Sequence, residues 1–270
     1  MIQRRDLVAS SGPIWRLRPP GPTVYLPCLV ALSSVLAWDL AVRAARSDLF
    51  PGPWQVALGI AELMRKGLLP KYVVASLFRV TWGFGLAVLV GVPFGLLMGW
   101  FRPAYWAFNP LLQVLRPISP IAWIPLAILW FGVSDAAPVF LIFLASVFPI
   151  AVSASAAVQN LQPVYLRAAR NFGLGRVQLF RRVILPAALP QILTGVRIAL
   201  GVAWLVVVAA EMIAVNSGLG YLIIDARNAG KRYDLVVAGM LVIGVIGLIL
   251  DLLVRRLERF EEVSWGYGSR

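Results

Sequence analysis

Histidine is absent from this chain of 270 residues, and cysteine occurs once, as Cys28. Disulfide frameworks and Cys/His metal sites are therefore excluded within one chain, as is histidine-dependent acid–base or triad chemistry. Charged residues are also scarce, at 14% of the sequence against about a quarter in soluble proteins. Most familiar enzyme classes are disfavoured on these grounds, and we expect neither enzymatic activity nor a bound metal or cofactor in this chain.

Apolar residues dominate instead, with 60% of the sequence hydrophobic and a mean hydropathy of +0.82. A run of about 18 apolar residues spans the roughly 30 Å hydrocarbon core of a bilayer as a helix, and the sequence offers several such runs. The net charge is +13, but the basic residues flank the apolar runs, which is typical of cytoplasmic loops and headgroup contacts. The sequence predicts an all-α integral membrane protein that contacts the lipid bilayer and no nucleic acid.

Six segments are predicted to cross the bilayer, and they divide the chain into four parts. We expect a cytoplasmic N-terminal tail at 1–23, a first transmembrane helix with an outer amphipathic segment at 24–75, a core domain at 76–257 that includes a polar loop at 159–188, and a cytoplasmic C-terminal tail at 258–270. The predicted spans are residues 24–42, 76–100, 104–131, 136–158, 189–214 and 235–254. Trp54–Gly67 is predicted to form the amphipathic helix on the outer face.

The distribution of Lys and Arg predicts the orientation of these spans. Six spans put both termini on one side of the membrane. With the N-terminus inside, fifteen basic residues fall in cytoplasmic segments and nine in outer segments, six of the nine between residues 43 and 79. Because basic loops favour the cytoplasmic side, we expect both termini in the cytoplasm.

Glycine and proline mark two special stretches within the spans. Gly91, Gly95 and Gly99 recur every four residues, so they share one helix face and let another helix approach closely. The third span is broken by prolines, which remove backbone donors and disfavour helix before them. Such a span is tolerated only where protein or a water-filled cavity covers the freed backbone. Arg116–Pro125 is therefore either a lining of a pathway or a simple kink. The four prolines are Pro110, Pro117, Pro120 and Pro125.

The loop Gln159–Ala188 is too polar to cross the bilayer and too patterned to be a plain connection. Val164–Asn171 is predicted as a short helix, Gly173-Leu174-Gly175 as a turn and Arg176–Ile184 as a second short helix. An apolar stripe of Val177, Phe180 and Ile184 is expected beside a basic face. This compact hairpin suits either docking into a groove on another protein or contact with lipid headgroups, and the pattern alone leaves both open.

The same loop resembles the cytoplasmic signature of bacterial ATP-binding-cassette (ABC) importer permeases. That signature reads Glu-Ala-Ala, three residues, Gly, nine residues, Ile, one residue, Leu-Pro, and Ala168-Ala169, Gly173 and Leu185-Pro186 match it. Arg167 replaces the Glu and Val183 replaces the Ile, which puts any carboxylate contact with an ATPase in doubt. Further segments are similar to the nitrate, sulfonate, taurine and bicarbonate permeases, over about residues 76–257. These segments are Ser76-Leu77 with Arg79, Gly83–Gly99, Arg116–Pro125, Gly195–Arg197, Ala203-Trp204, Ala209–Glu211 and Asn216–Tyr221.

The resemblance implies a type I importer fold, in which a core of five helices follows one extra N-terminal helix. Two copies, or this chain and a paralogous permease, would form the pathway in a bacterial inner membrane. Two cytoplasmic ATPases would bind ATP and Mg, and an extracytoplasmic binding protein would deliver a small oxyanion. An alkanesulfonate or taurine is favoured slightly over nitrate or bicarbonate. The sequence holds no phosphate-binding Gly-x-x-x-x-Gly-Lys-Ser/Thr loop. The residues expected to couple to the ATPases are Arg167, Ala168, Ala169, Arg170, Phe172, Gly173, Leu174, Gly175, Phe180, Leu185 and Pro186.

Five residues are candidates for the pathway. Glu211 lies in the fifth span. A charge there costs about 2.5–3.5 kcal/mol on insertion scales, so we expect the Glu211 side chain to face the interior of the helical bundle. A structural hydrogen bond or salt bridge is the alternative for Glu211, with Arg197 too far along the same helix to be its partner. Ser146 and Ser153 share one face of the fourth span, although hydroxyls in helices often bond only their own backbone. The remaining candidates, in the broken third span, are Ser119 and Trp123.

Three further classes of function remain open from the sequence. A secondary transporter driven by an ion gradient would favour inverted repeats and intramembrane carboxylate relays, whereas the sequence shows one deep acidic residue and no convincing repeat. A membrane-embedded enzyme would need a Ser/Lys or Tyr arrangement that the chain does not display. An ABC permease for a different small organic substrate is the third alternative.

Overall fold

The structure, a computed structural model, describes residues 22–45, 50–228 and 230–257. It divides into two units, Met1–Pro53 and Trp54–Arg270. The predicted tails lie outside the described residues, except that Pro22 and Thr23 already belong to the first helix. In the first unit α1 runs Pro22–Ala45 and is apolar enough to cross a membrane.

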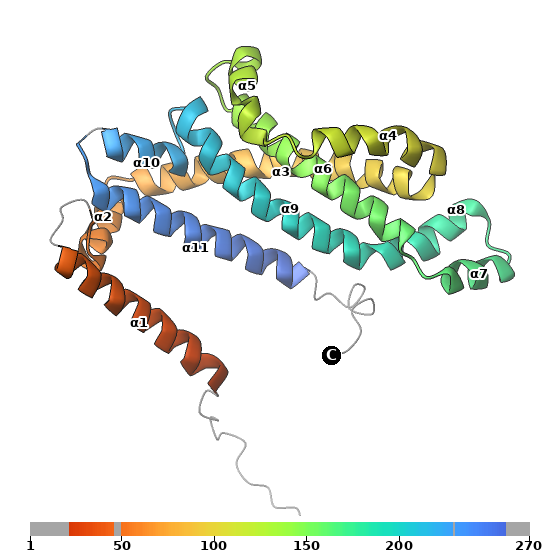
Figure 1. The fold of residues 1–270 in the computed structure, drawn as a ribbon, viewed down its shortest axis with the longest axis horizontal. Coiled ribbons are helices and arrows are strands. Elements are labelled where there is room, and N and C mark those ends of the chain that lie inside the picture. Colours follow the sequence, from red (N-terminus) through yellow and green to blue (C-terminus); the bar gives the residue numbers. More distant parts are fainter. Residues whose placement is uncertain (1–21, 46–49, 229, 258–270) are drawn as a thin grey trace, which may run out of the picture. The chain divides into compact units, whose positions relative to one another are not determined.

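The second unit is an all-helical bundle in the described residues (Figure 1). Four long helices form its body, and the shorter helices lie at its ends and along one side. The elements are α2 (Pro53–Arg65), α3 (Leu68–Trp100), α4 (Arg102–Leu115), the 3-10 turn η1 (Pro120–Trp123), α5 (Ile124–Phe131), α6 (Ala136–Gln159), α7 (Pro163–Asn171), α8 (Arg176–Leu179), the π-helical turn η2 (Phe180–Ile184), α9 (Leu185–Ala214), α10 (Leu219–Asn228) and α11 (Tyr233–Leu257).

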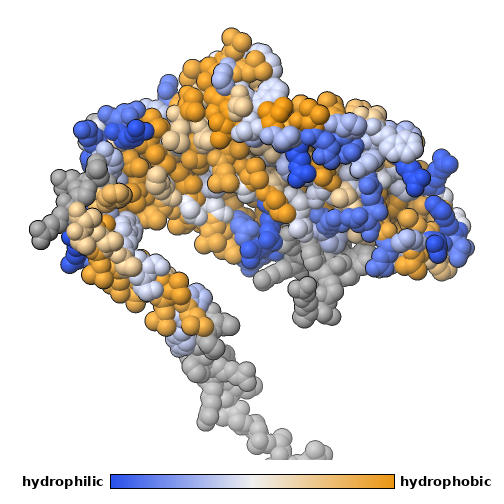
Figure 2. Space-filling view, viewed as in Figure 1, coloured by the Kyte–Doolittle hydropathy of each residue, from blue (hydrophilic) through white to orange (hydrophobic). Residues whose placement is uncertain are grey.

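Five helices of the described chain are long and apolar enough to span a bilayer, and α4 with η1–α5 makes a sixth span if the bent pair is counted as one. The pair bends by 84° around Pro117 and Pro120, which cannot continue the backbone hydrogen bonds of α4. The prediction of an all-helical membrane protein is confirmed. Figure 2 shows hydrophobic residues over much of the helical surface and hydrophilic residues around α7, α8 and α10 and at the C-terminal end of α11.

The two most closely packed helices, α3 and α6, run parallel with their backbones in near contact. A methyl group at Gly91 would lie 3.0 Å from the carbonyl oxygen of Val147, and one at Gly99 would lie 2.8 Å from that of Ser155. Gly95 is more crowded still, against the carbonyl of Ala151. The predicted close approach at these glycines is confirmed, and it brings the backbone of α3 against both the backbone and the side chains of α6.

One boundary and one short helix differ most from the prediction. The second span begins at Leu68 rather than Ser76, so Arg79, which the charge count grouped with the outer segment, lies well inside a helix. The short helix α10 was not predicted, because Leu219–Asn228 lies between two spans and has no strong periodicity. It packs against α9 and α11, and Trp204 of α9 donates to the carbonyl of Ile243 in α11 at 3.1 Å.

Candidate functional site

The polar loop forms the expected hairpin at the end of the bundle where α6 ends and α9 begins. Helix α7 closes at a turn in which Gly173 has a φ of +71°, a backbone conformation that glycine adopts without strain. The amide of Gly173 donates to the carbonyl of Arg170 at 2.9 Å, and that of Leu174 donates to Ala169 at 3.2 Å. The predicted helix–turn–helix is confirmed.

The inner face of the hairpin is part of the protein's own core. Ala169, Leu179 and Ile184 are buried among residues of α3, α6 and α9. Phe180 packs edge-to-face on Trp100, with ring centroids 5.8 Å apart. The hairpin is therefore held firmly on the ends of three long helices.

The predicted stripe of Val177, Phe180 and Ile184 is only partly correct. Phe180 and Ile184 face the core, but Val177 is exposed. The reason is the π-helical turn η2, in which the amide of Leu185 donates to the carbonyl of Phe180. A π turn inserts one residue into the helical repeat, and it precedes Pro186, which has no amide hydrogen to donate.

The outer face of the hairpin combines apolar side chains with unpaired cations. Phe172 is 85% exposed, and Val164 and Val177 are exposed as well. The five arginines of the hairpin are exposed and form no ion pair with any described residue, and no acidic residue occurs between 136 and 210. Of the coupling candidates, Arg167, Ala168, Arg170, Phe172, Gly173 and Gly175 are exposed, Leu174, Phe180, Leu185 and Pro186 are half-buried, and Ala169 is buried.

The opposite end of the bundle holds a buried polar network centred on Arg79. Its side chain is 1% exposed, and all five of its N–H groups donate hydrogen bonds. Nη1 donates to Glu211 Oε1 and to the carbonyl of Ser217, each at 2.7 Å. Nε and Nη2 donate to Asp135 Oδ1 at 2.8 and 2.7 Å, and Nη2 also donates to the hydroxyl of Ser217.

Glu211 is equally well satisfied. Its Oε2 accepts from the Ser76 hydroxyl at 2.9 Å and from the Gly220 amide at 3.0 Å, while Ser76 accepts from the amide of Leu219. Gly218 has a φ of +105°, and a methyl group there would overlap the Glu211 carboxylate. The network thus fastens α3, α9, the start of α6 and the segment before α10 to one another.

The structure brings Glu211 together with Arg79, a partner that sequence reasoning missed. The signal available in the sequence was Arg79 itself, which lies within the apolar stretch that begins at Leu68, because ionisable residues inside transmembrane segments usually pair with one another. Arg197 pairs instead with Asp251 of α11 at 3.3 Å. The other four pathway candidates do not belong to this network.

Those four candidates lie in different surroundings. Ser146 is fully buried, and its hydroxyl has no hydrogen-bond partner among the described residues. Ser153 packs against Gly195, and its hydroxyl donates to the carbonyl of Gln191 at 3.3 Å. Ser119 is exposed before η1, and Trp123 is half-buried against a core cluster that includes Ala127. The contacts do not join the four into one surface, and their place in a pathway stays a prediction.

The sequence itself matches a known family. The family model described as "Binding-protein-dependent transport system inner membrane component" matches residues 91–262. The chain belongs to this family. It is a multi-pass inner membrane protein and the permease subunit of an ABC importer, and the ATPase activity lies in a partner subunit. ABC importer permeases assemble with ATPase subunits and a binding protein.

Characterised relatives cover almost the whole chain. The permease is 39% identical over 245 residues to the taurine transport system permease protein TauC of Escherichia coli (strain K12), covering 88% of each chain. It is 33% identical to the nitrate import permease protein NrtB of Synechocystis, over 88% of this chain and 89% of the relative. It is 34% identical to the bicarbonate transport system permease protein CmpB of Synechococcus elongatus, over 91% of each.

Solved structures of ABC importers show the same fold. A chain of the inward-facing MetNI methionine ABC transporter aligns with a TM-score of 0.63 at 20% identity, covering 72% of the permease and 96% of that chain. A chain of the bacterial alginate ABC transporter aligns with a TM-score of 0.58 at 16% identity, covering 92% and 95%. The importer-permease fold that the resemblance implied is confirmed.

Proposed function

We propose that two copies of this permease form the pathway of an importer for a small oxyanion, with an aliphatic sulfonate such as taurine first and nitrate or bicarbonate next. The taurine, nitrate and bicarbonate permeases among its relatives support this substrate class. Coupling to the ATPases is carried by one observation: Phe172 stands exposed on a hairpin whose inner face is part of the core. A rigid base with an exposed aromatic and surrounding cations suits docking into an apolar cleft with an acidic rim.

The proposed orientation puts this hairpin and both termini in the cytoplasm. Arg79 is one of the nine basic residues assigned to the outer segments, and the structure buries it in α3. Leaving it out lowers the outer count of basic residues from nine to eight against fifteen inside, and so strengthens the cytoplasmic assignment. The network end then faces the binding protein, which delivers the substrate on the outer side.

In the proposed mechanism, ATP binding closes the ATPase pair and moves the two hairpins with it. Because α8, η2 and α9 form one span, Arg176–Ala214, movement of the hairpin is transmitted along that span. Two such bundles then alternate between inward and outward openings. Ser119, Trp123, Ser146, Ser153 and Glu211 remain our candidates for contact with the substrate.

The test replaces Phe172 with alanine in the complex reconstituted with its ATPase and binding protein. Removing an exposed hot-spot aromatic is expected to lower ATP-dependent taurine uptake by about tenfold or more, with the melting temperature of the permease unchanged. The matched control is Phe78→Ala, another exposed phenylalanine, on α3, which should retain uptake. Coupling through the hairpin is refuted if both variants transport normally.

The substrate is tested separately in the wild-type complex. Taurine, nitrate and bicarbonate are compared as stimulators of ATPase activity in the presence of the binding protein, and taurine should give the strongest stimulation. A lack of response to all three would contradict the oxyanion assignment while leaving the hairpin's role intact.

A further inference from the structure

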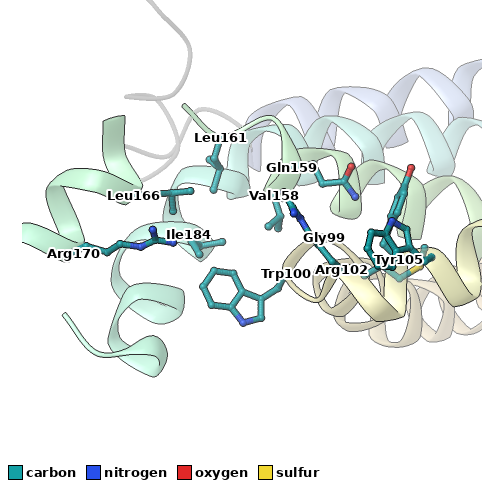
Figure 3. Close-up of a pocket in the computed structure, with 12 residues that line it drawn as sticks. Gly99, Trp100, Arg102, Tyr105, Val158, Gln159, Leu161, Leu166, Arg170 and Ile184 are labelled. Atoms are coloured by element: carbon teal, nitrogen blue, oxygen red, sulfur yellow. The ribbon is translucent and has the colours of Figure 1, made fainter. Parts of the chain in front are cut away.

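A cavity of about 680 Å³ lies between the hairpin and the start of α4 (Figure 3). One wall comes from the end of α3 and the beginning of α4, with Arg102, Tyr105 and Trp106. The other comes from the end of α6 and from the hairpin, with Gln159 and Arg170. The volume falls within the about 300–1,000 Å³ typical of sites that bind whole small molecules.

The polar chemistry of the cavity is that of an anion site. Arg102 and Arg170 approach it from different elements (Figure 3), and neither forms an ion pair with a described residue. The lining residues all come from 98–106 and 158–184, two stretches that contain no Asp or Glu. Two guanidinium groups, with the amide of Gln159 nearby, match the oxygens of a phosphate group.

The position of the cavity indicates which phosphate reaches it. It opens where α3 ends at Trp100 and α6 ends at Gln159, and the ends of spans lie at the depth of lipid headgroups. Trp100, Tyr105 and Trp106 are the aromatic side chains that favour this interface. Trp106 is 70% exposed, so it offers apolar surface to an acyl chain beside the two cations.

We propose that this cavity binds the phosphate headgroup of an anionic phospholipid, with Arg102 and Arg170 clamping the phosphate. Basic pockets between transmembrane helices are suited to such headgroups. Because one arginine belongs to α4 and the other to α7, the bound lipid ties the hairpin to the helical bundle. This site is independent of the substrate that the permease carries.

The experiment measures lipid retention by native mass spectrometry on the full-length permease in detergent. Phosphatidylglycerol and phosphatidylcholine with identical acyl chains are titrated in parallel. The wild type should retain phosphatidylglycerol at least about tenfold better, because both lipids carry a phosphate but the quaternary ammonium of phosphatidylcholine adds a positive charge that the two guanidinium groups repel. The double variant Arg102→Gln with Arg170→Gln should lower this preference to within about twofold.

The matched control is Arg176→Gln with Arg181→Gln, which removes two exposed hairpin arginines that do not line the cavity. It should keep the wild-type preference. The single variant Arg170→Gln, at an exposed position on α7, gives an intermediate loss and serves if the double variant folds poorly. Equal losses in the two double variants, or no preference in the wild type, would overturn the site.

A second arm separates lipid from soluble phosphate. Inorganic phosphate at about 10 mM, in large excess over the lipid, should leave phosphatidylglycerol bound, because the acyl chains add apolar contacts that phosphate lacks. Displacement of the lipid by inorganic phosphate would overturn the assignment to a phospholipid. Failure of this site leaves the Phe172 experiment unaffected, since that experiment reads ATP-dependent uptake.

Discussion

The two ends of the bundle use the same side chain in opposite ways. At the network end Arg79 is buried, and every N–H group it has is bound within the protein. At the hairpin end five arginines are exposed, and none forms an ion pair with a described residue. The difference follows from where the acidic residues lie. Asp135 and Glu211 are at the network end, and the stretch of chain between them, which includes the hairpin, contains no Asp or Glu. The arginine at the network end is thus paired within the protein, whereas the arginines at the hairpin end are left for a partner to bind.

The largest effect should follow from breaking the buried pair. Arg79→Met leaves the Glu211 carboxylate buried without its counter-charge, which is expected to cost about 3–5 kcal/mol of stability. Melting in detergent and the yield of folded protein measure this loss. Asp135→Asn is the control, because Asp135 is 61% exposed and its pairing contributes about 1 kcal/mol or less. Similar melting of Arg79→Met and wild type would show that the network does not hold this end together.

A somewhat smaller loss is expected from Gly218→Ala. The new methyl group would meet the Glu211 carboxylate, and the backbone would sit at a φ that costs about 1–3 kcal/mol for residues other than glycine. Gly201→Ala provides the comparison, since Gly201 is helical and has open space around it; it should be neutral or gain up to about 1 kcal/mol. Melting curves distinguish the two, and equal stability would argue against the tight turn over Glu211.

At the hairpin end, loss of charge should weaken association and leave stability alone. Arg167→Gln is expected to change the melting free energy by less than about 0.5 kcal/mol. Its affinity for the ATPase should fall by about two- to fivefold at low salt, and the difference should shrink at about 1 M salt, where charges are screened. Pull-down titrations at both salt concentrations measure the effect. A salt-independent loss would mean that Arg167 acts through packing.

The smallest effect concerns the surface ion pair between α2 and the residue before α11. Hydrogen bonds from Arg232 and Lys66 lower the pKa of Glu62 to about 2, below its ordinary value of 4.5. The pair therefore contributes above about pH 4.5, and its contribution declines as the pH falls toward 2. The melting temperature of wild type should exceed that of Glu62→Gln slightly at neutral pH. This difference in melting temperature should disappear as the pH falls toward 2. A difference that grows on acidification would contradict a stabilising role for the ionised Glu62 carboxylate.

Much of the fold could be predicted, because the signals were local. The glycine repeat at Gly91–Gly99 marks a helix face, and four prolines mark the bend between α4 and α5. The turn of the hairpin follows from Gly173 and its neighbours. Each of these features depends on residues within one or two turns of one another, so periodicity and backbone chemistry are enough to find them.

The buried network could not be predicted in the same way. Glu211 stood out as a deep acid, but its partner lies 132 residues earlier in the chain, at the start of the predicted second span, where the charge count grouped Arg79 with the outer segment. The π turn at Phe180–Ile184 also left no periodic signal, so the predicted orientation of Val177, on one stripe with Phe180 and Ile184, was wrong. Which long-range partners meet depends on how the helices pack, and helical periodicity carries no information about that packing.

The span from Arg176 to Ala214 contains 39 residues and is about 58 Å long at 1.5 Å per residue. It begins in the hairpin, and it holds Glu211 less than one turn from its other end. One continuous helical span of this length transmits movement between the hairpin at one end and the Glu211 network at the other. Disrupting the hydrogen bonds around Glu211 should therefore weaken the coupling between the hairpin and the rest of the span, even when Phe172 and its neighbours are intact.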